Sequence, residues 1–113
     1  MTDCIFCKII KKEIPSKIIY EDDIALAFED IGPQAPVHIL VIPKKHIPTT
    51  LDLRDEDDHL MGHLFKIANK VAKDKGIAES GFRLIVNSNP ESGQVVYHIH
   101  LHILGGRRLH GLG

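Results

Sequence analysis

The chain has 113 residues, which is the length of one compact domain, and we expect a single domain over residues 1–113. Fourteen basic residues are balanced by fifteen acidic ones, so the charge offers no footprint for a nucleic acid or a membrane surface. No apolar run approaches the roughly 18 residues of a membrane span, and the start, Met1-Thr2-Asp3-Cys4, lacks the regions of a signal peptide. We therefore expect a cytoplasmic protein that binds neither nucleic acid nor membranes.

Apolar periodicity and turn residues predict a short helix, five strands and a long helix. The short helix covers residues 5–12 and ends before Pro15. A loop at 30–36 carries two prolines and a glycine, which deny it regular pairing. The strands are predicted at residues 17–20, 24–28, 38–42, 82–86 and 95–104.

The long helix lies between the third and fourth strands. Its N-cap is predicted at Asp52 or Asp55, and Gly76 is predicted to follow its last turn. The connections between strands are mostly of hairpin length, which predicts an antiparallel α+β fold with the helix packed on the sheet. The helix shows apolar residues at three-to-four spacing: Leu60, Met61, Leu64, Phe65, Ala68, Val71 and Ala72.

Three of the eight histidines alternate in the last predicted strand, as His98, His100 and His102. Side chains in a strand alternate between faces, so the three imidazoles share one face. Each imidazole has a donor and an acceptor that need partners when buried, which favours a site over packing or a solvated strand. We expect the other histidines of the helix and tail, His59, His63 and His110, at the surface.

A metal site made of all three alternating histidines is one interpretation. However, His98 and His102 would have Cα atoms about 13 Å apart at a rise of about 3.3 Å per residue. With metal–nitrogen bonds of about 2 Å, at least one imidazole must do something else. A neutral imidazole is a nucleophile, and phosphorus is a natural target for it.

Attack on phosphorus also needs donors for the phosphoryl oxygens. Backbone N–H groups of the turn at 92–95 and the side chains of Asn87 and Gln94 could supply them. Neither a Walker-type loop nor a G-x-G-x-x-G motif occurs, which disfavours a kinase or a dehydrogenase.

Cys4 and Cys7 have the spacing of half a zinc site. A thioredoxin-like redox pair is the first alternative, although no strand precedes the pair to build the junction on which that motif sits. Two unpaired buried cysteines are the second alternative.

The segment His98-Ile99-His100-Leu101-His102-Ile103-Leu104 resembles the signature of the histidine triad (HIT) family, in which histidines alternate with apolar residues. Further segments resemble the Hint branch of that family, and Gly105-Gly106-Arg107 favours it over the Fhit branch. These segments are residues 9–15, 30–36, 38–44 and 93–97.

The resemblance implies a homodimer in which two five-stranded antiparallel sheets join into one of ten strands. It implies hydrolysis of purine nucleoside phosphoramidates to a nucleoside 5′-monophosphate and an amine. His100 would be the nucleophile and form a nucleotidyl-histidine, His102 would contact the phosphate or assist proton transfer, and His38 would support the site. A dinucleoside polyphosphate hydrolase and a non-catalytic nucleotide- or partner-binding protein remain the alternatives.

The resemblance also implies ligand sets. Asp30 and Ile31 would hold the ribose and base, with Ile9 and Phe28 on the apolar side, and Asn87 and the segment Gly93-Gln94-Val95 would hold the phosphate. Some Hint proteins have serine where this chain has Val95, so only the backbone N–H remains there as a donor. A structural zinc ion, not required for the chemistry, would bind Cys4, Cys7, His46 and His98.

Overall fold

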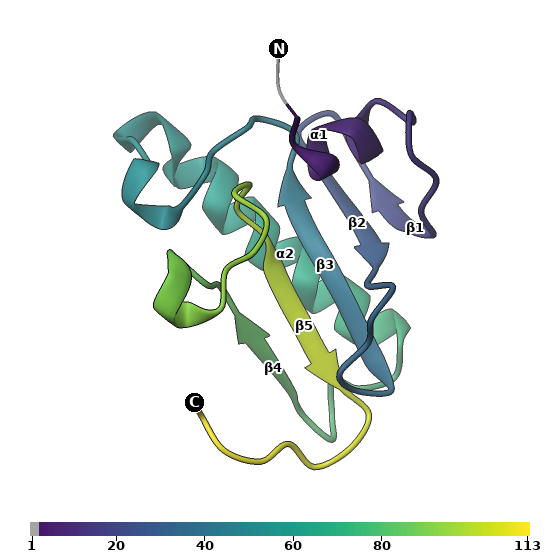
Figure 1. Cartoon of the computed structure of the whole chain (residues 1–113). Coiled ribbons are helices and arrows are strands. Elements are labelled where there is room, and N and C mark those ends of the chain that lie inside the picture. Colours follow the sequence, from purple (N-terminus) through teal and green to yellow (C-terminus); the bar gives the residue numbers. More distant parts are fainter. Residues whose placement is uncertain (1–2) are drawn as a thin grey trace.

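The computed structural model describes residues 3–113. Met1 and Thr2, the first two residues of the segment predicted not to be a signal peptide, lie outside the described residues. One antiparallel sheet of five strands has the order β1-β2-β3-β5-β4 (Figure 1). The strands are β1 (Ile18–Glu21), β2 (Ala25–Glu29), β3 (Val37–Pro43), β4 (Phe82–Ile85) and β5 (Leu101–Gly105). The predicted fold class, a five-stranded antiparallel sheet with one long and one short helix, is confirmed.

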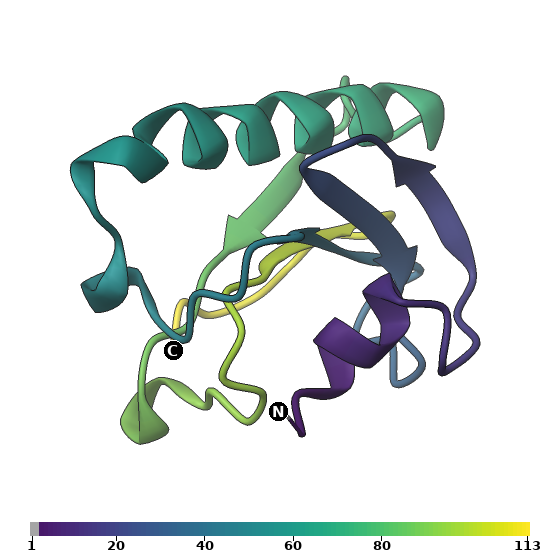
Figure 2. The ribbon, with the colours of Figure 1, turned by 90° about the horizontal axis from the view of Figure 1, so that it is seen from above.

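The two helices lie on opposite faces of the sheet (Figure 2). Helix α2 (Asp58–Asp74) covers one face, and helix α1 (Ile5–Ile10) lies on the other. None of the helices within residues 3–113 has the length and apolar character that crossing a bilayer requires.

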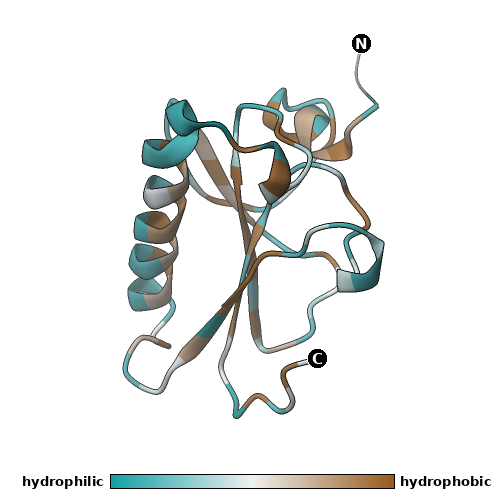
Figure 3. Cartoon of the chain, turned by 90° about the vertical axis from the view of Figure 1, so that its left-hand side faces the viewer, coloured by the Kyte–Doolittle hydropathy of each residue, from teal (hydrophilic) through white to brown (hydrophobic). Residues whose placement is uncertain are grey.

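Strand alternation divides the apolar residues into two clusters. The α2 side of the sheet carries the larger cluster of buried apolar residues. Figure 3 shows largely brown strands beside helix α2, whose outer surface is teal. The α1 side carries a smaller apolar cluster, and His98 and His100 share that side, because both rings contact Phe6. The α2 cluster includes Ala25, Ala27, Ile39, Val41, Leu64, Ala68, Ile99, Leu101 and Ile103; the α1 cluster includes Phe6, Ile9, Leu26, Phe28, Leu40 and Ile42.

The predicted start of the long helix is wrong. Asp52 closes a capping box with Thr49 around the short 3-10 helix Thr50–Asp52, and Asp55 begins a second 3-10 turn, Asp55–Asp57. Helix α2 then starts at Asp58. The predicted end is confirmed, because Gly76 has φ +74° just after the C-cap and its N–H donates to the Lys73 carbonyl at 3.1 Å.

The last predicted strand is also too long, because pairing begins only at Leu101 and residues 95–100 are irregular. Continuing the β3–β5 register would place Ile99 opposite Pro43, which has no N–H to donate. Instead, the Ile99 N–H donates to the Ile47 carbonyl at 2.7 Å. Ile99 is fully buried in the α2 cluster, so the in-and-out alternation persists without the ladder.

Candidate active site

The ring of His100 is fixed by its own backbone. His100 Nδ1 lies 2.8 Å from the His98 carbonyl oxygen, and a carbonyl can only accept, so Nδ1 carries the proton. The other nitrogen, Nε2, therefore has a free lone pair. Burial lowers the pKa of His100, which keeps the ring neutral near pH 7. The Phe6 ring packs edge-on against His100 with centroids 5.0 Å apart.

The third histidine is held by a second imidazole. Strands β3 and β5 pair Leu40 with His102, which makes His38 a diagonal neighbour of His102 on the same face. His38 Nε2 lies 2.9 Å from His102 Nδ1. On the far side of the His38 ring, Nδ1 accepts the backbone N–H of Gln34 at 3.0 Å.

These contacts fix the proton positions in the pair. Because His38 Nδ1 accepts from Gln34, a neutral His38 has its proton on Nε2 and donates it to His102 Nδ1. His102 is then protonated on Nε2, and within residues 3–113 this buried atom has no hydrogen-bond partner. Burial, with His100 and His38 nearby, lowers the pKa of His102 to about 4, so the ring is a neutral donor.

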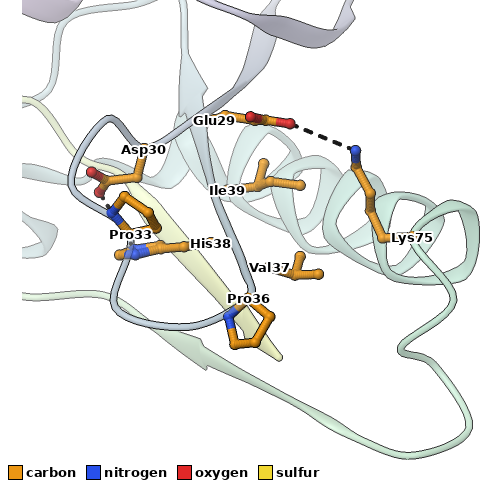
Figure 4. Close-up of a pocket in the computed structure, with 8 residues that line it drawn as sticks. All are labelled: Glu29, Asp30, Pro33, Pro36, Val37, His38, Ile39 and Lys75. Carbon is orange, nitrogen blue, oxygen red and sulfur yellow. Dashed lines mark ion pairs between the residues drawn. The ribbon is translucent and has the colours of Figure 1, made fainter. Parts of the chain in front are cut away.

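Asp30 lies beside the histidine pair. Its Oδ2 is 3.4 Å from His38 Nε2, and Figure 4 shows the two side chains facing each other at the end of the loop that joins β2 to β3. Asp30, His38 and His102 bring ligand-type atoms within 4.8 Å of one another. The 2.9 Å contact between the two imidazoles is a hydrogen-bond distance, so we assign this group to proton positioning.

A pocket of about 360 Å³ opens in front of His100 and His102. It collects nearly all of the residues predicted to hold a nucleotide: Ile9, Phe28, Asp30, Ile31, Asn87, Gly93, Val95, His100 and His102. His38 lies behind His102 and does not line this pocket. The volume and the largely apolar lining suit a small organic ligand with a polar end.

Gln94 is the predicted nucleotide residue that does not line the pocket. Its side-chain amide donates to the Pro48 and Val96 carbonyls, and its Oε1 accepts the Asn89 N–H at 2.6 Å. The side chain thus holds the loop around Gly93, and only the backbone of Gln94 remains for a ligand.

Some lining residues were missed by sequence reasoning. Phe6 and Leu40 carry no chemical signal, and an apolar periodicity cannot tell a pocket wall from core. Ser16 Oγ is buried without a hydrogen-bond partner among the described residues, and no sequence pattern marked it. The missed lining residues are Ile5, Phe6, Ile14, Pro15, Ser16, Glu29, Leu40 and Val96.

The four predicted metal ligands meet at one point. His98 Nδ1 lies 3.3 Å from Cys4 Sγ, 3.6 Å from Cys7 Sγ and 3.2 Å from His46 Nδ1, and Cys7 Sγ lies 3.4 Å from His46 Nδ1. Tetrahedral zinc, with bonds of about 2.0–2.3 Å, places neighbouring ligand atoms roughly 3.3–3.8 Å apart. This cluster could therefore bind a metal ion.

The partners of the cluster prepare it for a cation. His98 Nε2 lies 2.8 Å from the Pro43 carbonyl, so Nε2 carries the proton and Nδ1 presents its lone pair to the sulfur atoms. Burial lowers the pKa of His98 to about 4 and raises the pKa of the Cys7 thiol, on which Cys4 acts in the same direction. The neutral ring suits a metal ligand, and a bound cation would displace the thiol protons.

Two of the three histidines predicted at the surface, His59 and His110, are exposed, but His63 is half-buried. His63 Nε2 lies 2.6 Å from Asp22 Oδ2, which joins α2 to the β1–β2 turn. The spacing of the helix did not reveal this partner, because Asp22 comes from a distant turn.

His100, whose Nε2 has a free lone pair, lies between His98, which faces two sulfur atoms, and His102, which carries an N–H, and this arrangement supports a histidine-based hydrolase. Residues 11–109 match the HIT domain family. A purine nucleoside phosphoramidase of Escherichia coli (strain K12) is 54% identical over 107 residues, which cover 95% of this chain and 90% of that protein.

Solved structures give the same result. A HIT family hydrolase from Legionella pneumophila has a TM-score of 0.92 at 52% identity, covering 94% of this chain and 95% of that one. A HIT family hydrolase from Clostridium thermocellum has a TM-score of 0.95 at 47% identity, covering 99% and 97%. The chain belongs to the histidine triad family, in its Hint branch, and this membership supports a hydrolase.

Proposed function

We propose that the protein hydrolyses the P–N bond of purine nucleoside phosphoramidates through a nucleotidyl-histidine on His100. The observation that carries this proposal is the 2.8 Å contact between His100 Nδ1 and the His98 carbonyl. It leaves the Nε2 lone pair of a neutral, pocket-lining ring as the nucleophile. The related Escherichia coli protein is named a purine nucleoside phosphoramidase, which supports the same reaction.

In the first step, His100 Nε2 forms a bond to phosphorus, the P–N bond breaks, and the leaving nitrogen takes up a proton from solvent water and departs as an amine; the water that attacks in the second step returns this proton to solvent. His102 Nε2–H, which has no partner among residues 3–113, donates to a phosphoryl oxygen or to the leaving nitrogen. Water then attacks the nucleotidyl-His100, which releases the nucleoside 5′-monophosphate and restores the ring.

The pocket suggests how the nucleotide lies. Ile9, Phe28 and Ile31 offer apolar surface for the purine, and Asp30 offers a carboxylate for the ribose hydroxyls. The backbone around Gly93 and the Asn87 side chain line the pocket and would hold the phosphate.

A turnover assay tests this proposal against its two alternatives. We expect wild type to release AMP from adenosine 5′-phosphoramidate, and His100→Ala to lose this activity while still binding AMP. Preferred cleavage of a diadenosine polyphosphate would indicate a dinucleoside polyphosphate hydrolase, and AMP binding without turnover would indicate a binding protein. His59→Ala, which changes an exposed histidine, is the matched control. Mass mapping of a trapped adenylyl group to His100 would identify the nucleophile.

Three further properties belong to the proposal. Zinc would bind Cys4, Cys7, His46 and His98 with four protein ligands, as a structural ion not required for the chemistry. A cytoplasmic location suits a thiol pair kept reduced for metal binding. A homodimer would join two sheets into one of ten strands, which light scattering would test.

A further inference from the structure

We infer that Arg107 is a positioning residue that sets the proton on His38, and through it the donor on His102, from outside the pocket. The inference rests on the proposed function, because it assigns a role in the same site. Arg107 follows β5 and is exposed, and it does not line the pocket in front of His100.

Two sets of hydrogen bonds, joined by the backbone of Gln34, connect Arg107 to the site. Its guanidinium Nη2 donates to the Gln34 carbonyl at 2.9 Å. The N–H of the same residue, Gln34, donates to His38 Nδ1 at 3.0 Å. His38 Nε2 then reaches His102 Nδ1 at 2.9 Å, and His102 Nε2 has no hydrogen-bond partner among residues 3–113. The Gln34 bond fixes the proton of a neutral His38 on Nε2, and the His38 bond fixes the proton of His102 on Nε2.

Gly106, the residue before Arg107, packs closely against the same loop. Gly106 has φ +94°, and a Cβ there would lie 2.8 Å from Pro36 Cβ and 3.5 Å from the Val37 nitrogen. A glycine is therefore needed for this close approach. Pro36 lies at the end of the loop that Figure 4 shows leading into His38 on β3. The residues after β5 thus contact this loop twice: Gly106 packs against Pro36, and Arg107 donates to the Gln34 carbonyl.

Apart from the bonds to Arg107 and His38, Gln34 is held only weakly by the loop itself. Gln34 itself is exposed, and its side chain donates at 3.3 Å to Gly32, a residue of the same loop. The carbonyl and the N–H of Gln34 belong to two successive peptide groups, so Arg107 acts on the N–H by holding the backbone at Gln34 in place. Without Arg107, this backbone can shift and the N–H can turn away from His38 Nδ1. His38 can then take the proton on Nδ1, leave Nε2 as an acceptor and stop donating to His102. His102 would lose the partner that keeps its own proton on Nε2.

Neighbouring positions supply matched variants. Arg107→Ala removes the bond to Gln34, and Arg107→Lys keeps an amine that can donate to the same carbonyl. Arg108→Ala changes the adjacent exposed arginine, whose side chain has no hydrogen bond or ion pair among residues 3–113. Equal thermal unfolding midpoints would show that all three variants fold alike.

The first experiment reads the proton directly, by long-range ¹H–¹⁵N NMR of the imidazoles in the ligand-free protein. Wild type and Arg108→Ala should show His38 with the proton on Nε2, and Arg107→Ala should show a mixture with the proton on Nδ1. A wild-type pattern in Arg107→Ala would overturn the inference, whatever the activity. The tautomer shift combined with an inactive wild type would instead overturn only the proposed function.

The second experiment measures turnover of adenosine 5′-phosphoramidate. Losing a donor that is fixed only indirectly should lower kcat of Arg107→Ala about 3- to 10-fold, with KM little changed. Arg107→Lys should recover most of kcat, and Arg108→Ala should match wild type. A rise in KM with unchanged kcat would mean that Arg107 contacts the substrate, which contradicts a positioning role.

Discussion

His98 and His102 stand two residues to either side of His100, yet their surroundings give them opposite roles. Burial lowers the pKa of both rings to about 4, so both are neutral. His98 Nε2–H donates a hydrogen bond to the Pro43 carbonyl, which leaves the Nδ1 lone pair facing two sulfur atoms. His102 is backed by His38, which donates to it and leaves an N–H.

The difference shows that the hydrogen-bond partner of one ring nitrogen, which we call the backing group, decides whether the other nitrogen carries a lone pair or a proton. A backbone carbonyl makes a neutral imidazole a metal ligand at its other nitrogen, whereas a donating imidazole makes it a hydrogen-bond donor there. His100 between them follows the first rule, since the His98 carbonyl leaves it with a free lone pair. In the proposed function, three identical residues thus serve as a metal ligand, a nucleophile and a hydrogen-bond donor.

The largest effect is expected from His102→Phe, which removes the N–H donor of His102 and keeps an aromatic ring of similar shape. We expect kcat for the phosphoramidate to fall by about 10²–10³-fold, the usual contribution of one positioned hydrogen-bond donor to a charged transition state, with a smaller change in KM. Single-turnover kinetics would measure it. Retention of kcat within threefold would show that the partnerless Nε2–H of His102 has no role in the chemical step.

Removing metal ligands of the cluster around His98 should lower the free energy of unfolding more than it lowers turnover. The double variant Cys4→Ser, Cys7→Ser should lose bound zinc and about 4 kcal/mol of unfolding free energy, if free metal stands near 1,000 times Kd. Metal analysis and urea unfolding, with and without a chelator, would measure both. A metal-free wild type whose stability is unaffected by chelator would refute the zinc site.

The sequence was sufficient for the parts of the fold that follow from periodicity. Alternation placed Ile99, Leu101 and Ile103 against α2 and the three histidines on the other side, and both patterns are confirmed. The end of β5 was not predictable in the same way. It depends on which residue faces Pro43, which is a property of strand register and not of either segment alone.

The candidate site shows the same division. The motif and the family resemblance named residues that meet at the pocket and at the metal cluster. The Gln34 N–H that sets the His38 proton carries no side-chain signal, so only the folded loop reveals it. The Gln94 side chain looked like a phosphate donor, but it is bonded to its own loop, because a buried amide takes the nearest backbone partners.

The pH dependence of the unfolding free energy tests whether His102 is neutral in the folded protein. The pKa of His102 is about 4 in the folded protein, against an ordinary value of 6.5, so between these values the unfolded state binds more protons. Stability is therefore full above pH 6.5 and is lost as the pH falls toward 4, by up to about 1.4 kcal/mol per pH unit for this ring.

Urea unfolding between pH 7.5 and 5 would measure that slope, and His102→Phe should flatten it by one proton. An unchanged slope in the variant would mean that His102 is already charged in the folded protein. That result would also contradict its assignment as a neutral donor.

The smallest expected effect comes from a third kind of backing group, the carboxylate of Asp22 on His63. Burial alone would raise the pKa of Asp22, but hydrogen bonds from His63, the backbone and Tyr20 lower it to about 2. Because the pair is partly exposed, we expect His63→Ala to cost only about 1 kcal/mol, with the Asp22 contribution present above pH 3.8 and lost as the pH falls through 2. His59→Ala, one turn earlier and exposed, should stay within about 0.5 kcal/mol. Neither variant should alter phosphoramidate turnover, because His63 on α2 lies on the face of the sheet opposite His100. An equal loss of stability in both variants would mean that the contact between His63 and Asp22 contributes nothing.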